Sequence, residues 1–419
     1  MMRTMMLVAA SVVAGGGAAA AVVRLGGTGS DVMAISSADE RGRPGPDSAR
    51  VAMTLTALGR TDPVLCDMIG DQLGNFWWGG ERGGLGRFGD HAPALRAAKD
   101  SLSGGVTDPS AIQLLVTSLG ADDPCVRRVA AKMLGHSTMA TDRLERLLRD
   151  PSPRIREAAA FAAGMDERPT LRVSLERGLD DNEVQVAAMM AWALGQIEDP
   201  ASVPSLARAI RSGESALRLA AVWALGQIEE LRSATIVAPL LRDADANVRA
   251  AAAEALGQIE NPASTSALVS VLGDSVANVR LAVVEALGQI EDAAALDGLT
   301  RALDDRDIRV RRAAAEAIGD LDGVHQAPAA LVRALSSDDA ELRRAAAHSL
   351  GHIADPATTS ALIGLLGDAD RDIRIVAVEG LSQIGTQAVV PGLMRALEDK
   401  DPEVRRAAAE ALGEVDSKE

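Results

Sequence analysis

The stretch DADANVRAAAAEALGQIENPASTSALVSVLGD, residues 243–274, decides the fold of this chain. Within it, Val248, Ala252, Leu256 and Ile259 follow one another at spacings of four, four and three. Residues at these spacings lie on one face of an α-helix, so the stretch predicts a helix with one apolar side.

The same stretch contains the start of this helix and a second helix after it. Asp245 stands just before the apolar run, in the position of an N-cap. A second apolar run follows Asn261 and Pro262 and carries Leu268, Val271 and Leu272. We therefore expect two antiparallel helices, neither of which can bury its apolar face alone.

The pattern recurs along most of the chain, with a period of about 31 residues. The position of Gly257 is occupied by a glycine in every repeat but one, which has serine: Gly135, Gly164, Gly195, Gly226, Gly257, Gly288, Gly319, Gly351, Ser382 and Gly413. Units of this length bury their apolar faces by stacking on their neighbours. The sequence therefore predicts an all-α solenoid of about ten to eleven stacked two-helix repeats.

The last repeat, DPEVRRAAAEALGEV at 401–415, places Asp401 as N-cap and Pro402 at the first helical position. It resembles the HEAT-repeat family, in the short form named after phycobilisome lyases. The resemblance covers about residues 104–415, and 46–63 looks like one more, divergent repeat. It implies an α-solenoid fold, and it leaves open an activity of the phycobilisome-lyase type.

Arginine recurs eight residues before the glycine position. The resemblance implies that these arginines, together with caps such as Asp245 and Asp401, bond between neighbouring repeats; a ladder that binds anions is the alternative. Ala187 replaces the arginine in one repeat, where we expect a local weakness or a changed angle. The arginines are Arg127, Arg156, Arg218, Arg249, Arg280, Arg311, Arg343, Arg374 and Arg405.

The composition excludes some classes of function. The chain of 419 residues carries 59 acidic and 43 basic residues, a formal charge of −16. Such a surface repels a phosphate backbone, so no nucleic-acid partner is expected. Tyrosine is absent, and only three phenylalanines and four tryptophans occur. The core must therefore consist of small aliphatic side chains, which suits thin, closely packed helices.

The N-terminus has the layout of an export signal. Residues 1–25 combine one early arginine with an apolar run and small residues, which predicts a signal peptide or an N-terminal membrane anchor. Residues 26–46 are predicted to be a flexible linker. We therefore expect an exported protein, periplasmic or associated with the cell envelope. The two cysteines, Cys66 and Cys125, are then either free thiols or a disulfide.

Residues 47–103 are predicted to form a divergent first repeat with a glycine-rich loop at 74–93, and residues 104–419 to form the solenoid. The loop holds four of the seven aromatic residues of the chain. Two interpretations stay open: the aromatic side chains cap the exposed end of the array, or they join the aromatic residues of the repeats in binding a ligand. They are Phe76, Trp77, Trp78 and Phe88.

The other three aromatic residues all stand three residues before the glycine position, in consecutive repeats. This position points away from the core on the second helix of each repeat, which lines the concave side in HEAT-like solenoids. An apolar patch edged by amides and carboxylates is typical of an interaction site. The predicted partner-binding stripe comprises Phe161, Trp192, Trp223, Leu219, Gln196, Gln227, Glu254 and Glu285.

No pattern predicts catalysis, a metal or a cofactor. The glycines of GLGRFG at 84–89 do not follow a strand, as a dinucleotide fingerprint would. No histidine precedes a glutamate, unlike the His-Glu pairs of deoxyhypusine hydroxylase, a HEAT-type enzyme. His348 and His352 are four apart but lack a third ligand. Farther along the face, Arg312 is expected to pair with Glu316, and Arg406 with Glu410.

The function predicted from the sequence is a non-catalytic scaffold that binds a peptide or protein, basic or apolar in character, on its concave face. Contact with a membrane is expected only through the N-terminal segment. The alternative is a phycobilisome-lyase-type enzyme or a protein that binds a bilin-like small molecule.

Overall fold

The structure is a computed structural model of the chain. The chain forms two compact units, Met1–Ser205 and Leu206–Glu419. The residues that the structure describes are 20–24, 32–36, 47–58, 106–165 and 167–417.

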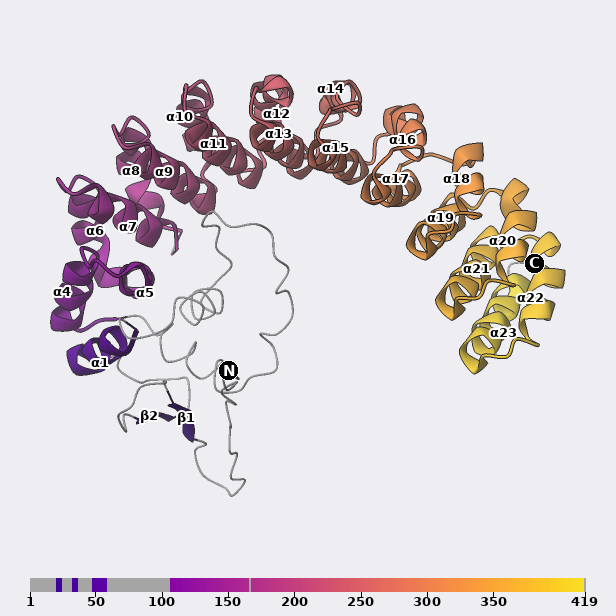
Figure 1. The fold of residues 1–419 in the computed structure, drawn as a ribbon, viewed down its shortest axis with the longest axis horizontal. Coiled ribbons are helices and arrows are strands. Elements are labelled where there is room, and N and C mark those ends of the chain that lie inside the picture. Colours follow the sequence, from indigo (N-terminus) through magenta and orange to yellow (C-terminus); the bar gives the residue numbers. More distant parts are fainter. Residues whose placement is uncertain (1–19, 25–31, 37–46, 59–105, 166, 418–419) are drawn as a thin grey trace, which may run out of the picture. The chain divides into compact units, whose positions relative to one another are not determined.

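The N-terminal unit contains alternating short and long helices (Figure 1). Val51 and Leu55 of the first helix, α1, are buried, and α1 packs on α4 and α5. The helices are α1 Ser48–Leu58, α4 Pro109–Ser118, α5 Pro124–Gly135, α6 Thr141–Leu147, α7 Pro153–Gly164, α8 Arg172–Gly178 and α9 Val184–Ile197.

The C-terminal unit repeats the same alternation, and α10, Val203–Ala209, runs across the division between the units. Its long helices are α11 Ser215–Gln227, α13 Ala246–Ile259, α15 Ala277–Ile290, α17 Ile308–Asp320, α19 Ala340–Ile353, α21 Arg371–Ile384 and α23 Pro402–Ser417. Its short helices are α12 Ala234–Val237, α14 Thr265–Val269, α16 Leu296–Ala302, α18 Ala329–Ala334, α20 Thr359–Leu365 and α22 Val390–Ala396.

Within this unit the long helices form one layer and the short helices another, and the long helices line the inner side of its curve (Figure 1). Each long helix packs on the next long helix of the unit, and each of α12 to α22 with an even number packs on the helix that follows it. Most repeats also hold one turn of 3-10 helix before or after the short helix, for example η7 Pro262–Ser264. The predicted all-α solenoid of two-helix repeats is confirmed.

Near the N-terminus, two strands form an antiparallel pair, β1 Ala20–Arg24 with β2 Val32–Ser36. This pairing was not expected from the sequence, which predicts a signal or anchor over 1–25 and a linker over 26–46. Both of those remain predictions. Among the helices of the described residues, none combines the length and apolar character needed to cross a bilayer.

The long helices begin and end where the sequence indicates. The side chain of Asp245 accepts a hydrogen bond from the N–H of Asn247, and Asp401 accepts one from Glu403. Both residues are therefore N-caps, as predicted. At the other end, Glu260 adopts the left-handed conformation with φ of 50°. Its N–H bonds to the carbonyl of Gly257, which ends the helix.

The predicted apolar face of α13 is its core face, since Val248, Ala252, Leu256 and Ile259 are all buried. The second apolar run is helical over a shorter stretch than expected. Only Leu268 of its three apolar residues lies within α14 and is fully buried, while the other two, beyond its end, are half-buried.

The repeating glycine has a packing role. A Cβ atom built on Gly257 would lie 2.9 Å from Cα of Ala286 on the next long helix, and one built on Gly226 would lie 3.0 Å from Cα of Ala255. Real Cβ atoms are not found this close to backbone atoms, so the glycine is required where successive long helices approach one another. This contact explains the period of the glycine.

Replacing Gly257 with alanine is expected to destabilise the protein by about 1–3 kcal/mol, because the new methyl group must push α13 and α15 apart. Chemical denaturation of the full chain measures the change.

Gly413 provides the matched control, because it lies in α23 and a Cβ atom added to it would meet no atom within 4 Å. Gly413→Ala should raise the free energy of unfolding by up to about 1 kcal/mol, since alanine is the better helix former. Equal effects of the two substitutions would contradict the close-approach explanation.

Candidate interaction surface

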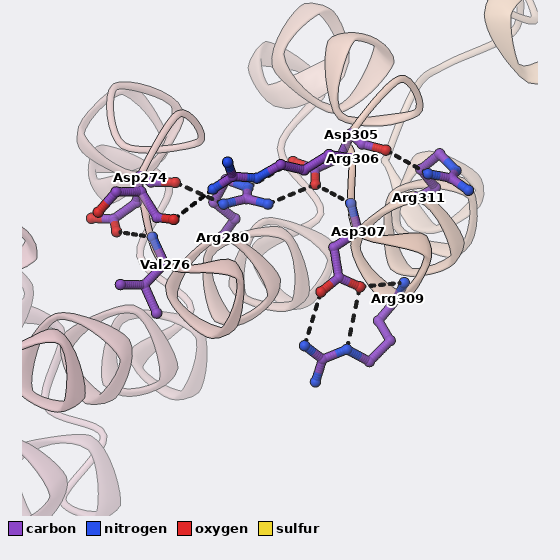
Figure 2. Close-up of polar contacts among 9 residues, drawn as sticks. Asp274, Val276, Arg280, Asp305, Arg306, Asp307, Arg309 and Arg311 are labelled. Carbon is purple, nitrogen blue, oxygen red and sulfur yellow. Dashed lines mark hydrogen bonds and ion pairs between the residues drawn. The ribbon is translucent and has the colours of Figure 1, made fainter.

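Hydrogen-bonded ion pairs between neighbouring repeats hold the long helices in place (Figure 2). Arg280 of α15 donates from Nε and Nη2 to the carboxylate of Asp305, each at 2.7 Å, and from Nη1 to the carbonyl oxygen of Asp274 at 2.8 Å. Asp305 also accepts the N–H of Asp307, and its carbonyl accepts a bond from Arg311. One arginine thus joins the loop before its own helix to the loop before the next.

This arrangement recurs between successive repeats, and we call it the arginine–aspartate ladder. The predicted bonding between repeats is confirmed for six of the nine arginines, but the predicted partner is wrong. The partner is the aspartate two residues before the cap, because the cap carboxylate, as in Asp245, bonds to its own helix. The pairs are Arg156–Asp181, Arg218–Asp243, Arg249–Asp274, Arg280–Asp305, Arg343–Asp368 and Arg374–Asp399. The side chains of Arg127, Arg311 and Arg405 donate to carbonyl oxygens of the loop before their own helix.

The ladder favours the charged form of its aspartates. Hydrogen bonds from Arg280 lower the pKa of Asp305, against the effect of burial, and the N–H of Asp307 adds to this. Burial by itself would raise the pKa of Asp274, but the hydrogen bonds from Arg249 and the N–H of Val276 lower it overall. Arginine and aspartate are therefore both ionised at neutral pH.

Two other predicted ion pairs are wrong. Arg312 donates to Asp339 of the next repeat, with Nε to Oδ1 at 2.8 Å, rather than to Glu316. The hydrogen bond from Arg312 lowers the pKa of Asp339 to about 2. Arg406 bonds to Glu403 at 2.6 Å rather than to Glu410. Arg312 thus bonds to the N-cap of the next long helix, α19, and Arg406 bonds to a glutamate in the first turn of its own helix, α23. Neither bonds to the glutamate four residues ahead, as the sequence predicted.

Removing a ladder arginine should be costly. Arg280→Met leaves the largely buried carboxylate of Asp305 without its partner, so we expect the free energy of unfolding to fall by about 2–4 kcal/mol. Urea denaturation provides the measurement. Arg309→Ala is the control: its pair with Asp307 lies at the surface, so its loss should change stability little. A similar loss in both variants would show that the ladder is no stronger than a surface pair.

The ladder also predicts a dependence on pH. The pKa of Asp243 and of Asp305 is lower in the folded chain than the value of about 3.9 in unfolded chains. The stability that this supplies is complete above pH of about 4 and is lost as the pH falls through the folded-state values.

We therefore expect the melting temperature to fall between pH of about 4 and 2, measured in about 0.5 M salt to screen exposed charges. The loss should be smaller in Arg280→Met, which lacks one pair. A melting temperature that is constant between pH of about 4 and 2 would contradict this contribution of the ladder to stability.

In the C-terminal unit, three successive long helices present matching residues. On α11, α13 and α15, the positions seven before, three before and one after the repeating glycine form three rows along the stack. We call these nine residues the three-row face. The first row is Leu219, Ala250 and Leu281; the middle row is Trp223, Glu254 and Glu285; the third is Gln227, Gln258 and Gln289.

The rows run across the helices because each helix packs on the next at the same register. Nε2 of Gln227 donates to Oε1 of Gln258 at 3.1 Å, which links two members of the amide row. Trp223 and Glu254 are half-buried, while Glu285, Gln258 and Gln289 are exposed. The face therefore combines an apolar row, a largely acidic row and an amide row.

The sequence pattern predicts part of this face. It singled out Leu219, Trp223, Gln227, Glu254 and Glu285, which the structure places on these helices. It missed the remaining members of the outer rows, namely Ala250, Leu281, Gln258 and Gln289. The repeat period could have located them, because each stands one or two periods after Leu219 or Gln227.

In the N-terminal unit, the predicted stripe is partly buried. The rings of Phe161 and Trp192 stack with centroids 5.5 Å apart and an angle of 20° between their planes. Phe161 is only 5% exposed, so it is buried, whereas the sequence suggested a place on an open apolar patch. Trp192 packs against Gly164, whose small size leaves room for the indole. Trp192 and Gln196 are both half-buried.

The loop residues Phe76, Trp77, Trp78 and Phe88 lie outside the described residues, so both interpretations of the loop remain predictions. Cys125 is disulfide-bonded, and no free cysteine occurs among the described residues. The other cysteine, Cys66, lies outside them.

His348 and His352 lie side by side on α19 with ring centroids 4.2 Å apart. Both are exposed. Within the described part of the chain, no group of three or more histidine, cysteine, aspartate or glutamate side chains could hold a metal ion.

The stack of two-helix repeats, with glycine contacts and a ladder between them, defines the protein as an α-solenoid. Its sequence matches the model of HEAT repeats at residues 171–244, 234–319, 301–379 and 360–419. These segments cover more than half of the chain, which therefore belongs to the HEAT-repeat family. The comparison with curated proteins found no match.

Solved structures share the fold at low identity. Yeast importin-β, Kap95p, is 15% identical with a TM-score of 0.55; the match covers 87% of this chain and 57% of that protein. A second structure, of Kap95p bound to RanGDP, is also 15% identical with a TM-score of 0.55. This match covers 88% of this chain and 56% of that protein. The chain thus spans a little over half the length of importin-β, and the likeness is one of fold alone.

A complex of CpcE and CpcF of phycocyanin lyase from Nostoc is 25% identical, with a TM-score of 0.35 and coverage of 59% of this chain and 94% of that one. At that TM-score the similarity supports no conclusion about a lyase activity in this chain.

Proposed function

We propose that this protein is a scaffold that binds a protein partner on the inner layer of its solenoid. The observation that carries the proposal is the three-row face on α11, α13 and α15. Three repeats present the same order of apolar, acidic and amide side chains, with Trp223 at one end. Surfaces of this mixture anchor a partner through the aromatic residue and orient it through polar contacts.

The charge of the protein favours a basic partner. With a formal charge of −16, the whole chain attracts cationic segments, and Glu254 and Glu285 lie in the centre of the face. One protein of the same fold supports the proposal: importin-β forms a complex with Nup1. That partner belongs to importin-β and is not assigned to this chain.

A photo-crosslinking amino acid at Gln289 tests the location of the surface. Gln289 is exposed on the three-row face, so irradiation in the native cell should join it to the partner. The matched control is the same amino acid at Leu231, an exposed residue before the short helix α12. Adducts are detected by gel shift and mass spectrometry. Equal adducts from both sites, or adducts from Leu231 alone, would place the partner elsewhere.

Trp223 should be the main anchor. In the Gln289 cross-linking variant, Trp223→Ala is expected to reduce the adduct about tenfold or more, since a buried aromatic anchor contributes about 2 kcal/mol or more to binding. Leu231→Ala, which also removes an exposed apolar side chain, should leave the yield unchanged. A thermal melt of each variant separates loss of binding from loss of folding. An unchanged yield in a folded Trp223→Ala variant would contradict the anchor role.

We also propose that the protein is exported. The apolar run of residues 1–25 after an arginine supports this, and so does the disulfide at Cys125, because disulfides persist in oxidising compartments. Protein isolated from its native cells under acid quench should take up a thiol-reactive label at Cys125 only after reduction. N-terminal sequencing of the same sample reports processing. Full labelling without reduction, together with an unprocessed start, would refute export.

A further inference from the structure

Two histidines lie side by side on α19, at positions that other repeats fill differently. His348 stands three residues before the repeating glycine Gly351, and His352 stands one residue after it. The same two positions hold glutamate and aspartate on α17, glutamate and glutamine on α21, and two glutamates on α23. Among the long helices of the described residues, only α19 carries imidazoles at both positions. This repeat therefore has nitrogen donors that its neighbours lack.

The two imidazoles take no part in the core of the repeat. Both side chains are exposed, and the buried face of α19 is formed by other residues. Each ring contacts the other, with centroids 4.2 Å apart and 53° between the planes. Among the described residues, neither ring forms a hydrogen bond or an ion pair. Their nitrogen atoms are therefore available to a ligand from solution.

This arrangement suits the chelation of one metal ion. Residues four apart lie one above the other on a helix, which is the spacing of the two zinc-binding histidines in the H-E-x-x-H pattern. Zinc binds imidazole nitrogen at about 2.0–2.1 Å, so two coordinated nitrogens lie about 3 Å apart. Two rings with centroids 4.2 Å apart can reach this separation by rotation of the side chains, with no change in the helix.

The helix that carries the pair is fixed by both of its neighbours. A Cβ atom built on Gly351, between the two histidines, would lie 2.9 Å from Cα of Gly380 on α21. A Cβ atom built on Gly319 of α17 would lie 2.8 Å from Cα of Ser349, beside the first histidine. Because the backbone is held in this way, little conformational freedom is lost when an ion binds.

The charge around the pair favours a cation. Glu316 and Asp320 on α17 and Glu379 on α21 occupy the equivalent positions of the two helices that pack on α19, and all three are exposed. The cation one turn before the pair, Arg344, is already paired with Glu341. The field of the neighbouring carboxylates therefore raises the local concentration of a divalent cation.

We propose that His348 and His352 bind one divalent ion of the late first-row metals, Cu²⁺, Ni²⁺ or Zn²⁺. Imidazole nitrogen suits these ions, whereas Mg²⁺ and Ca²⁺ prefer oxygen ligands. The described residues contain no group of three or more side chains that could hold a metal ion, so water or a donor atom of another molecule completes the coordination. The site lies outside the three-row face and is independent of the proposed function.

Isothermal titration calorimetry of the full-length protein, freed of metal with a chelator, measures the binding of Cu²⁺, Ni²⁺ and Zn²⁺. We expect one site per chain, with the highest affinity for Cu²⁺. His352→Gln should weaken Ni²⁺ binding about tenfold or more, because loss of a ligand costs at least as much as loss of a group that orients one. Glutamine stands at this position on α21, as Gln383, so the variant should fold. A thermal melt without metal checks this.

His348→Gln should have the same effect, and His325→Gln is the matched control. His325 is an exposed histidine in the loop after α17, so its replacement should leave the affinity unchanged. Electron paramagnetic resonance of bound Cu²⁺ counts the coordinated nitrogens directly. Two coupled nitrogens are expected in the unmodified protein and fewer in His352→Gln.

Three outcomes would overturn the proposal. Equal Ni²⁺ affinity of the unmodified protein, His348→Gln and His352→Gln would place the ion elsewhere on the chain. A Cu²⁺ spectrum without coupled nitrogen would show oxygen ligands alone. Half an ion per chain, together with a dimer in sedimentation, would place the site between two copies rather than on one helix. Cross-links from Gln289 report on the three-row face and test the proposed function separately.

Discussion

The bond between an arginine on one long helix and the aspartate before the next is the interaction on which the regular stack depends. The core of this protein consists mostly of alanine, leucine, valine and isoleucine, whose contacts are not directional. The guanidinium of Arg280, in contrast, has a fixed planar shape and contacts Asp274 and Asp305 at once. It therefore sets the register of each repeat on the next, while the small side chains supply the burial.

The glycine contact and the ladder work together in this respect. Gly257 lets α13 and α15 approach closely, and the ladder stops the two helices from sliding along that smooth contact. The consequence for function is that equivalent positions of successive repeats fall into rows on the inner layer. The alignment of Trp223, Glu254 and Glu285 therefore follows from the packing of successive long helices on one another.

Features that follow from the periodicity within one helix could be predicted from the sequence. Features that depend on which side chains of neighbouring repeats contact one another could not. The buried face of α13 and the caps at Asp245 and Asp401 follow from spacing within one helix. The partner of Arg249 was misassigned to a cap, because sequence does not show that the carboxylate of Asp245 bonds to its own helix.

The burial of Phe161 was missed for a related reason. Its position in the repeat is exposed in later repeats such as those of Glu285 and Glu316, but the stacked Trp192 covers it here. A pattern within one chain gives the average environment of a position, and a large neighbour changes that environment in a single repeat. The exposure of this position was therefore predicted better in the C-terminal unit than in the N-terminal one.

Two places where the ladder lacks its aspartate show how the stack accommodates a change. Ser212 and Ser337 occupy the ladder position, and each hydroxyl accepts the N–H two residues ahead while its carbonyl accepts an arginine, as at Asp305. The local turn is thus preserved without the charge. In the repeat before Ser337, Arg312 supplies a replacement bond to Asp339.

In the repeat before Ser212, no such replacement is possible, because Ala187 and Ala188 stand where the two arginines would be. The chain separates into its two compact units after Ser205, between these two ladder positions. The weakness or changed angle expected at Ala187 stays a prediction. The loop at Ser212 therefore depends on bonds within its own repeat, from the N–H of Glu214 and the guanidinium of Arg218, and not on a charge from the repeat before.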